Sequence, residues 1–96
     1  RDRWRSLICD PRWPWNCAAA LTVVGCESGL NPDAYNSSGS YGLAQIQWYW
    51  HRGKLRYVAG SEDPALLFQA EINLEVAAMI YEDGAWSAWS CKSTLP

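Results

Sequence analysis

The sequence predicts one mainly α-helical domain of the α+β type over residues 1–96, with a loop or rudimentary hairpin forming one wall of a groove. Two segments, residues 17–28 and the stretch after Pro64, repeat apolar residues at helical spacing. Residues 29–42 between them are rich in glycine, asparagine and serine, which favour turns. A chain of 96 residues buries a limited core, and its four cysteines suit two disulfides in an oxidising compartment.

Residues 1–16 are expected to form an N-terminal arm followed by a disulfide-closed loop. Residues 1–8 suit a short helix or an extended arm. Residues 9–17 contain two prolines, which exclude a long helix. Asn16 is a suitable cap for the helix that follows.

The segment 17–28 predicts a helix that ends at a glutamate on its apolar face. At about 100° per residue one stripe contains Ala20, Leu21, Val23, Val24 and Glu27. A carboxyl group on that stripe is partly removed from water, which favours its protonated form. An acid at a helix C-terminus also opposes the helix dipole, so structure alone gives no reason for Glu27 there. Gly29 is expected to end the helix.

Helix geometry restricts how Cys9, Cys17, Cys26 and Cys91 can pair. Cys17 and Cys26 are nine residues apart on one helix, roughly 13.5 Å, whereas a disulfide requires Cα atoms within about 7 Å. Excluding that pair leaves two connectivities. Cys9–Cys17 with Cys26–Cys91 is the simpler, because it closes the proline-containing loop and joins the tail to the helix of Glu27.

The second half of the chain predicts further helices. Leu43 to Trp50 suits a short helix, and Asp63 with Pro64 suits the start of the next one, as cap and first residue. Steps of three and four then place a buried face on Leu67, Ala70, Leu74, Ala77 and Tyr81.

Composition excludes several classes of partner. A net charge of −2 argues against nucleic-acid binding, although the excess of basic residues over positions 1–56 can face an anionic polymer. The sequence has no membrane span and no signal peptide, and its polar start suits a mature or trimmed form. His51 is the only histidine and there is no Cys-x-x-Cys pair, so we expect no metal and no cofactor. Because His51 is next to Arg52, we expect it at the surface. We expect a secreted monomer.

Tryptophan is unusually abundant, with seven residues in this short chain. Flat sugar faces are a natural partner for such rings, and we expect two or three of them to line a groove. Trp48, Tyr49 and Trp50 are consecutive, so they cannot all point the same way, and one or two should face that groove.

Two motifs bring chemistry to this framework. Cys26-Glu27-Ser28-Gly29 places one glutamate beside a serine, and Tyr41-Gly42-Leu43-Ala44-Gln45-Ile46 places a glutamine eighteen residues after Glu27. Together they resemble the lytic transglycosylase and goose-type lysozyme superfamily, over roughly residues 15–93. The nearest resemblance is to the catalytic domains of bacterial resuscitation-promoting factors and related small secreted transglycosylases. It implies a lysozyme-like fold and a bridge between Cys26 and Cys91.

The resemblance also implies roles for single residues. Glu27 would be the catalytic acid, with Ser28 supporting it or holding an N-acetyl group of the substrate. Gln45 would hydrogen-bond the sugar, and Tyr81 would face the glutamate from the last helix. Substrate contacts are further expected from Tyr41, Trp48 and Trp50. The sequence departs from the family at Trp48 to His51, where a proline or threonine region is usual, and the segment before Cys17 has no counterpart.

The implied activity is cleavage of the β-1,4 bond between N-acetylmuramic acid and N-acetylglucosamine in a peptidoglycan glycan strand. A second carboxylate would favour hydrolysis, and Asp33 in its turn is the nearest candidate. Without one, the sugar's own 6-hydroxyl can attack, as in a lytic transglycosylase. The alternatives are a non-catalytic module that binds cell-wall sugars and a chitin-degrading enzyme on the same fold.

Overall fold

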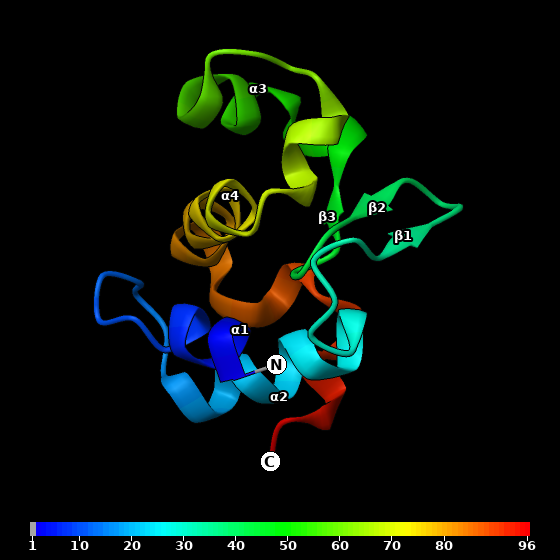
Figure 1. Cartoon of the computed structure of the whole chain (residues 1–96). Helices are drawn as coiled ribbons and strands as arrows, with labels where there is room; N and C mark the ends of the chain where they lie inside the picture. Colours follow the sequence, from blue (N-terminus) through cyan, green and yellow to red (C-terminus); the bar gives the residue numbers. More distant parts are fainter. Residues whose placement is uncertain (1) are drawn as a thin grey trace.

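The computed structural model describes residues 2–96 and is mainly helical, with one small sheet (Figure 1). The α-helices are α1 (Asp2–Ile8), α2 (Cys17–Ser28), α3 (Trp48–Ala59) and α4 (Ala70–Gly84). The 3-10 helix η1 (Pro64–Phe68) follows α3, and two more, η2 (Ala85–Ala88) and η3 (Ser90–Thr94), follow α4. The predicted fold class is confirmed. Arg1 of the predicted N-terminal arm lies outside the described residues.

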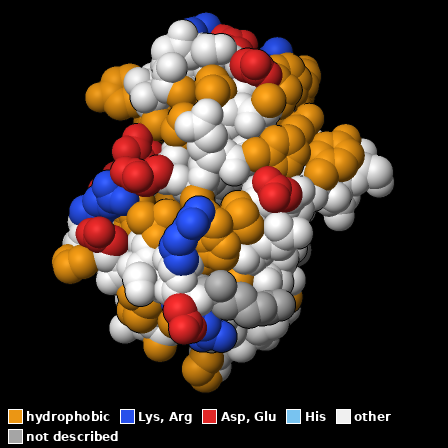
Figure 2. All heavy atoms as spheres, in the orientation of Figure 1, with side chains coloured by type: hydrophobic (Ala, Val, Ile, Leu, Met, Phe, Trp, Pro, Cys, Tyr) orange, Lys and Arg blue, Asp and Glu red, His pale blue; other side chains and the backbone are white. Residues whose placement is uncertain are grey.

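The small sheet is antiparallel, with strands in the order β1 (Tyr35–Asn36), β2 (Ser40–Tyr41) and β3 (Ile46–Gln47). In Figure 1 the sheet lies between α3 at one end of the molecule and α1 and α2 at the other. Hydrophobic side chains gather beside the β1–β2 hairpin in Figure 2. Within residues 2–96, no helix is both long enough and apolar enough to cross a membrane.

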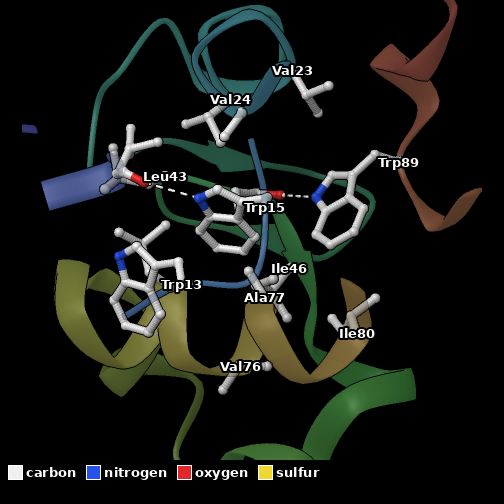
Figure 3. Packing of buried hydrophobic residues seen from close by; sticks show 14 of the residues in the cluster. Trp13, Trp15, Val23, Val24, Leu43, Ile46, Val76, Ala77, Ile80 and Trp89 are labelled. Carbon is white, nitrogen blue, oxygen red and sulfur yellow. Dashed lines mark hydrogen bonds between the residues drawn. The ribbon is translucent and has the colours of Figure 1, made fainter. Parts of the chain in front are cut away.

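The segment before α2 belongs to the core. Trp13 and Trp15 are buried, and their indole N–H groups donate to the carbonyls of Leu7 (2.7 Å) and Ile8 (2.9 Å) at the end of α1. The disulfide between Cys9 and Cys17 closes this loop, with Cα atoms 4.7 Å apart. Figure 3 shows Trp15 among side chains from α2 and α4. These two rings therefore stabilise the fold and are not available to a ligand.

Helix α2 has the predicted bounds and the predicted caps. The Asn16 side chain accepts a hydrogen bond from the Ala19 amide at 3.0 Å, and Gly29 ends the helix in the left-handed conformation, with φ of 65°. Ala20, Val23 and Val24 of the predicted apolar stripe are buried. The stripe therefore faces the core and brings the end of α2 against the rest of the molecule.

The prediction of a short helix over Leu43 to Trp50 is wrong. Ile46 pairs with Tyr41 across the sheet, so this part of the chain is strand β3, and helix α3 begins only at Trp48. Positive φ angles at Gly42 (74°) and Gln45 (51°) turn the chain between β2 and β3. A helix cannot include such residues, because helical φ is negative.

The helix expected after Asp63 is two helices. The Asp63 side chain accepts from the Ala65 amide at 3.0 Å, which confirms the cap. Gln69 is extended, with ψ of 117°, so its backbone separates η1 from α4. Leu67, Leu74 and Ala77 of the predicted face are buried, while Ala70 and Tyr81 are partly buried.

One buried polar side chain fixes the turn between β2 and β3 against α4. Asn73 is fully buried, and its Oδ1 accepts from the Ala44 amide at 2.9 Å. Its Nδ2 donates to the carbonyls of Tyr41 (2.8 Å) and Leu67 (2.9 Å). A Cβ atom on Gly42 would collide with Asn73, so this close contact requires glycine. The turn that presents Gln45 is therefore held in place by α4.

Candidate active site

A cavity of about 210 Å³ opens where the end of α2 meets the sheet and the C-terminal segment. Figure 1 shows the C-terminal segment beside α2. The lining residues come from these three regions: Glu27, Asn36, Ser38, Ser40, Gln45, Gln47, Ala88, Trp89 and Ser90. Glu27 is the only acidic side chain among them. The cavity therefore combines one carboxyl group with polar side chains suited to binding hydroxyl and amide groups.

The Glu27 carboxyl group is anchored through one oxygen. Its Oε2 accepts hydrogen bonds from the Cys91 amide at 3.0 Å and from the Ser90 hydroxyl at 3.2 Å. Among the residues described, its Oε1 has no hydrogen-bond partner. Glu27 is partly buried, so the protein orients the group while one oxygen remains free for a ligand in the cavity.

The donors to Glu27 are held by a disulfide. Cys26, directly before the glutamate, is bonded to Cys91, with Cα atoms 6.0 Å apart. This is the pairing that the resemblance implies, and with Cys9–Cys17 it makes the simpler of the two connectivities left open by helix geometry. Because Cys91 supplies the amide that binds Glu27, the bridge fixes donor and acceptor relative to each other.

Gln45 lies in the same cavity as Glu27. Its Nε2 donates to the carbonyls of Ala34 (3.1 Å) and Gly42 (3.0 Å), which orients the side-chain amide. Its Oε1 has no partner among residues 2–96 and can accept a hydrogen bond from a ligand. The φ of 51° is uncommon for a residue other than glycine, and such backbone conformations cluster at functional sites.

Three other predicted contact residues lie outside the lining of this cavity. The Ser28 hydroxyl donates to the Val24 carbonyl of its own helix at 3.2 Å. Tyr41 packs between the rings of Tyr35 and Phe68, at 5.1 Å and 5.5 Å between centroids. Tyr81 packs with Trp15 and Trp86, on the core side of α4.

The two tryptophans predicted to contact sugar also lie outside this lining. The Trp48 indole donates to the Glu62 carbonyl at 2.7 Å and is partly buried. Trp50 is 72% exposed on α3 and borders a different hollow. Asp33, the candidate for a second carboxylate, is exposed in its turn and does not line the Glu27 cavity.

Several lining residues were not expected from the sequence. Trp89 is buried, its ring packs in the hydrophobic core (Figure 3), and its indole donates to the Ala44 carbonyl at 2.8 Å. Trp89 also lines the Glu27 cavity. Ser90 was also missed, although its position before Cys91, the expected partner of Cys26, places it beside Glu27. Ser40 and Gln47 reach the cavity through β2 and β3, and no motif indicated them.

His51 is not the surface residue that we expected. It lines a cavity of about 40 Å³ whose wall includes four residues of the Glu27 cavity, Gln45, Gln47, Ala88 and Trp89. Its Nδ1 is buried and has no hydrogen-bond partner in the described part of the chain. Burial lowers the pKa of His51 below its usual value, Lys54 lowers it further, and Asp83 opposes both.

Comparison with known proteins gives one family. A family model described as the transglycosylase SLT domain matches residues 4–83, which include most of α1, all of α2, the sheet and α3, and nearly all of α4. The expectation that the segment before Cys17 has no counterpart in the family is wrong, because the match begins at residue 4. No curated protein and no solved structure matches the chain. The closer resemblance to resuscitation-promoting factors therefore stays a prediction.

Proposed function

Because the chain belongs to the transglycosylase SLT domain family, whose lytic transglycosylase-type activity cleaves peptidoglycan, we propose that Glu27 is the general acid of this reaction. The scissile bond is the β-1,4 linkage between N-acetylmuramic acid and N-acetylglucosamine. The observation that carries the proposal is that Glu27 is the only acidic residue lining its cavity. One of its oxygens is held by Cys91 and Ser90, and the other is free to face the substrate.

A single carboxyl group favours transglycosylation over hydrolysis. Protonated Glu27 donates its proton to the glycosidic oxygen, and the bond from that oxygen to C1 of N-acetylmuramic acid breaks. The 6-hydroxyl of the same sugar then forms a bond to C1, and its proton returns to the Glu27 carboxylate. The product is a 1,6-anhydro ring, no water is consumed, and Glu27 ends in its initial state. A second carboxylate to activate water is not required.

Gln45 is proposed to orient the sugar at this bond. Its free Oε1 can accept a hydrogen bond from the N–H of an acetamido group or from a hydroxyl group, while its amide nitrogen is occupied by Ala34 and Gly42. A side chain held in this way loses little conformational freedom on binding, which favours precise orientation. The two disulfides support a secreted protein that acts at the cell wall.

Digestion of purified peptidoglycan sacculi tests the proposal against its alternatives. The expected result is release of soluble muropeptides from sacculi, with little release of sugar from chitin. A module that only binds cell-wall sugars would bind sacculi without releasing fragments, and a chitinase would prefer chitin. Either of those two results would contradict the proposal.

Gln45→Ala is expected to lower both turnover and substrate affinity. The substitution removes the acceptor for the sugar and the two hydrogen bonds that hold the turn, each worth about 0.5–1.5 kcal/mol. A loss of roughly tenfold or more in kcat/KM on sacculi is the expected result. Gln69→Ala, at an exposed glutamine with no side-chain capping bond, is the matched control and should keep full activity. Equal kcat/KM in the two variants would remove Gln45 from the proposal.

A further inference from the structure

The exposed side of α3 has a second hollow, of about 360 Å³, with no lining residue in common with the Glu27 cavity. Helix α3 lies at one end of the molecule (Figure 1). The hollow has two aromatic residues, two arginines, a glycine and one acid in its lining: Tyr49, Trp50, Arg52, Gly53, Arg56 and Glu62. Trp50 is 72% exposed and Tyr49 is 60% exposed, so this surface presents large apolar faces to water.

The two rings of the hollow stand nearly perpendicular to each other. The Tyr49 and Trp50 centroids are 5.1 Å apart, with an angle of 89° between the ring planes. Next to them Gly53 leaves open space. Apart from its chain neighbours and the backbone of its own helix, no atom of the described residues lies within 4 Å of the position that a Cβ would take. The hollow therefore offers flat aromatic faces beside a gap, which suits contact with the apolar face of a sugar ring.

The charge of the hollow comes mainly from Arg52. Its guanidinium lies 4.6 Å from the Tyr49 ring centre, and its Nε donates to the Tyr49 carbonyl at 3.1 Å. Among residues 2–96, Arg52 forms no salt bridge, whereas Arg56 is paired with Glu62. The remaining N–H groups of Arg52 can bind a carboxylate, and stacking on the ring holds them in position.

We propose that this hollow is a second binding site, specific for a glycan that carries carboxylate groups. Trp50 contacts the face of a sugar, and Arg52 binds a carboxylate of the same strand. The inference rests on the proposed function, because peptidoglycan supplies both features through its sugars and the carboxylates of its peptides. Its role is to hold the polymer while the Glu27 cavity acts on it.

The hollow and the Glu27 cavity are close together along the chain, and the inference places one glycan strand across both. Gln47 lines the Glu27 cavity, and Tyr49, two residues later, lines the hollow. Their Cα atoms are therefore at most about 7.6 Å apart. An anionic membrane surface fits less well, because attraction to such a surface requires several basic residues. Within residues 2–96, Arg52 is the one cation in the lining that forms no salt bridge.

Binding to sacculi by proteins that also contain Glu27→Gln tests the inference without cleavage. In this background Trp50→Ala and Arg52→Gln should each weaken binding by roughly two- to tenfold. Tyr57→Ala is the matched control, because Tyr57 is 82% exposed on the same helix and does not line the hollow. Uncharged chitin oligosaccharides serve as the second probe: Trp50→Ala should weaken their binding, and Arg52→Gln should not.

Other outcomes would overturn the inference. The first is that Trp50→Ala and Arg52→Gln bind sacculi as tightly as Tyr57→Ala. The second is stronger binding to phosphatidylglycerol vesicles than to sacculi. The third is that the parent protein forms a dimer in solution and Trp50→Ala abolishes it. Circular dichroism of each variant checks that the protein is folded. Trp50→Phe should recover most of the affinity for sacculi because it restores an aromatic ring. Cleavage by the protein with Glu27 intact is measured separately, so failure of the proposed function is distinguishable from failure of this site.

Discussion

Glu27→Gln is expected to lower the rate of peptidoglycan cleavage by about 10²–10⁴-fold or more, the usual loss when a general acid is removed. The amide has nearly the same shape, and its oxygen can still accept the hydrogen bonds from Cys91 and Ser90. Stability and binding to sacculi should therefore change little. The measurement is release of soluble muropeptides at equal protein concentration, together with a thermal melt of each variant.

The control for this substitution is Glu82→Gln, at an exposed acid on α4 that forms no salt bridge within the described residues and does not line the cavity. This variant should cleave at the parent rate. Retention of more than about a tenth of the parent rate by Glu27→Gln would remove Glu27 from the role of general acid.

Removal of the Cys26–Cys91 disulfide is expected to cost about 4 kcal/mol in the free energy of unfolding. The bridge joins residues 65 positions apart, and the entropy of the unfolded chain rises strongly when so long a loop is opened. The Cys26→Ser/Cys91→Ser variant should therefore show a much lower denaturant midpoint. Activity should also fall where the protein is still folded, because the Cys91 amide is no longer fixed on Glu27.

The other disulfide provides the comparison. Cys9 and Cys17 are 8 positions apart, so the same estimate gives about 2.5 kcal/mol for Cys9→Ser/Cys17→Ser. This variant leaves the contacts of Glu27 in place and should lose stability without a comparable loss of kcat in the folded protein. If both double variants lose kcat equally, the Cys26–Cys91 bridge has no particular role in orienting Glu27.

Local patterns predicted the part of the site that depends on α2. The apolar stripe ends at Glu27, and Asn16 and Gly29 mark the ends of the helix by their capping chemistry. Gln45 lies in the same cavity because glycines after α2 allow the chain to return across its end. Side-chain spacing and capping are local properties, and for this reason one sequence contains enough information to predict them.

The contacts made by tryptophans depend on tertiary structure, and the sequence did not predict them. Trp13 and Trp15 turn inward because carbonyls of α1 accept their N–H groups. The direction of Trp48 and Trp50 depends on where α3 begins, and the pairing of β3 with β2 decides that position. The donors to Glu27 come from residues more than sixty positions away, and a local pattern contains no information about their distance.

Mass spectrometry of the products from purified sacculi is the most direct test that Glu27 alone supplies the acid and base. Digestion in isotopically labelled water followed by separation of the muropeptides gives both the mass and the origin of each new end. The account predicts 1,6-anhydro-N-acetylmuramic acid ends, lighter by one water molecule than hydrolysed ends and free of the isotope label. Reducing ends that contain labelled oxygen would contradict it, because they would require a second group that activates water.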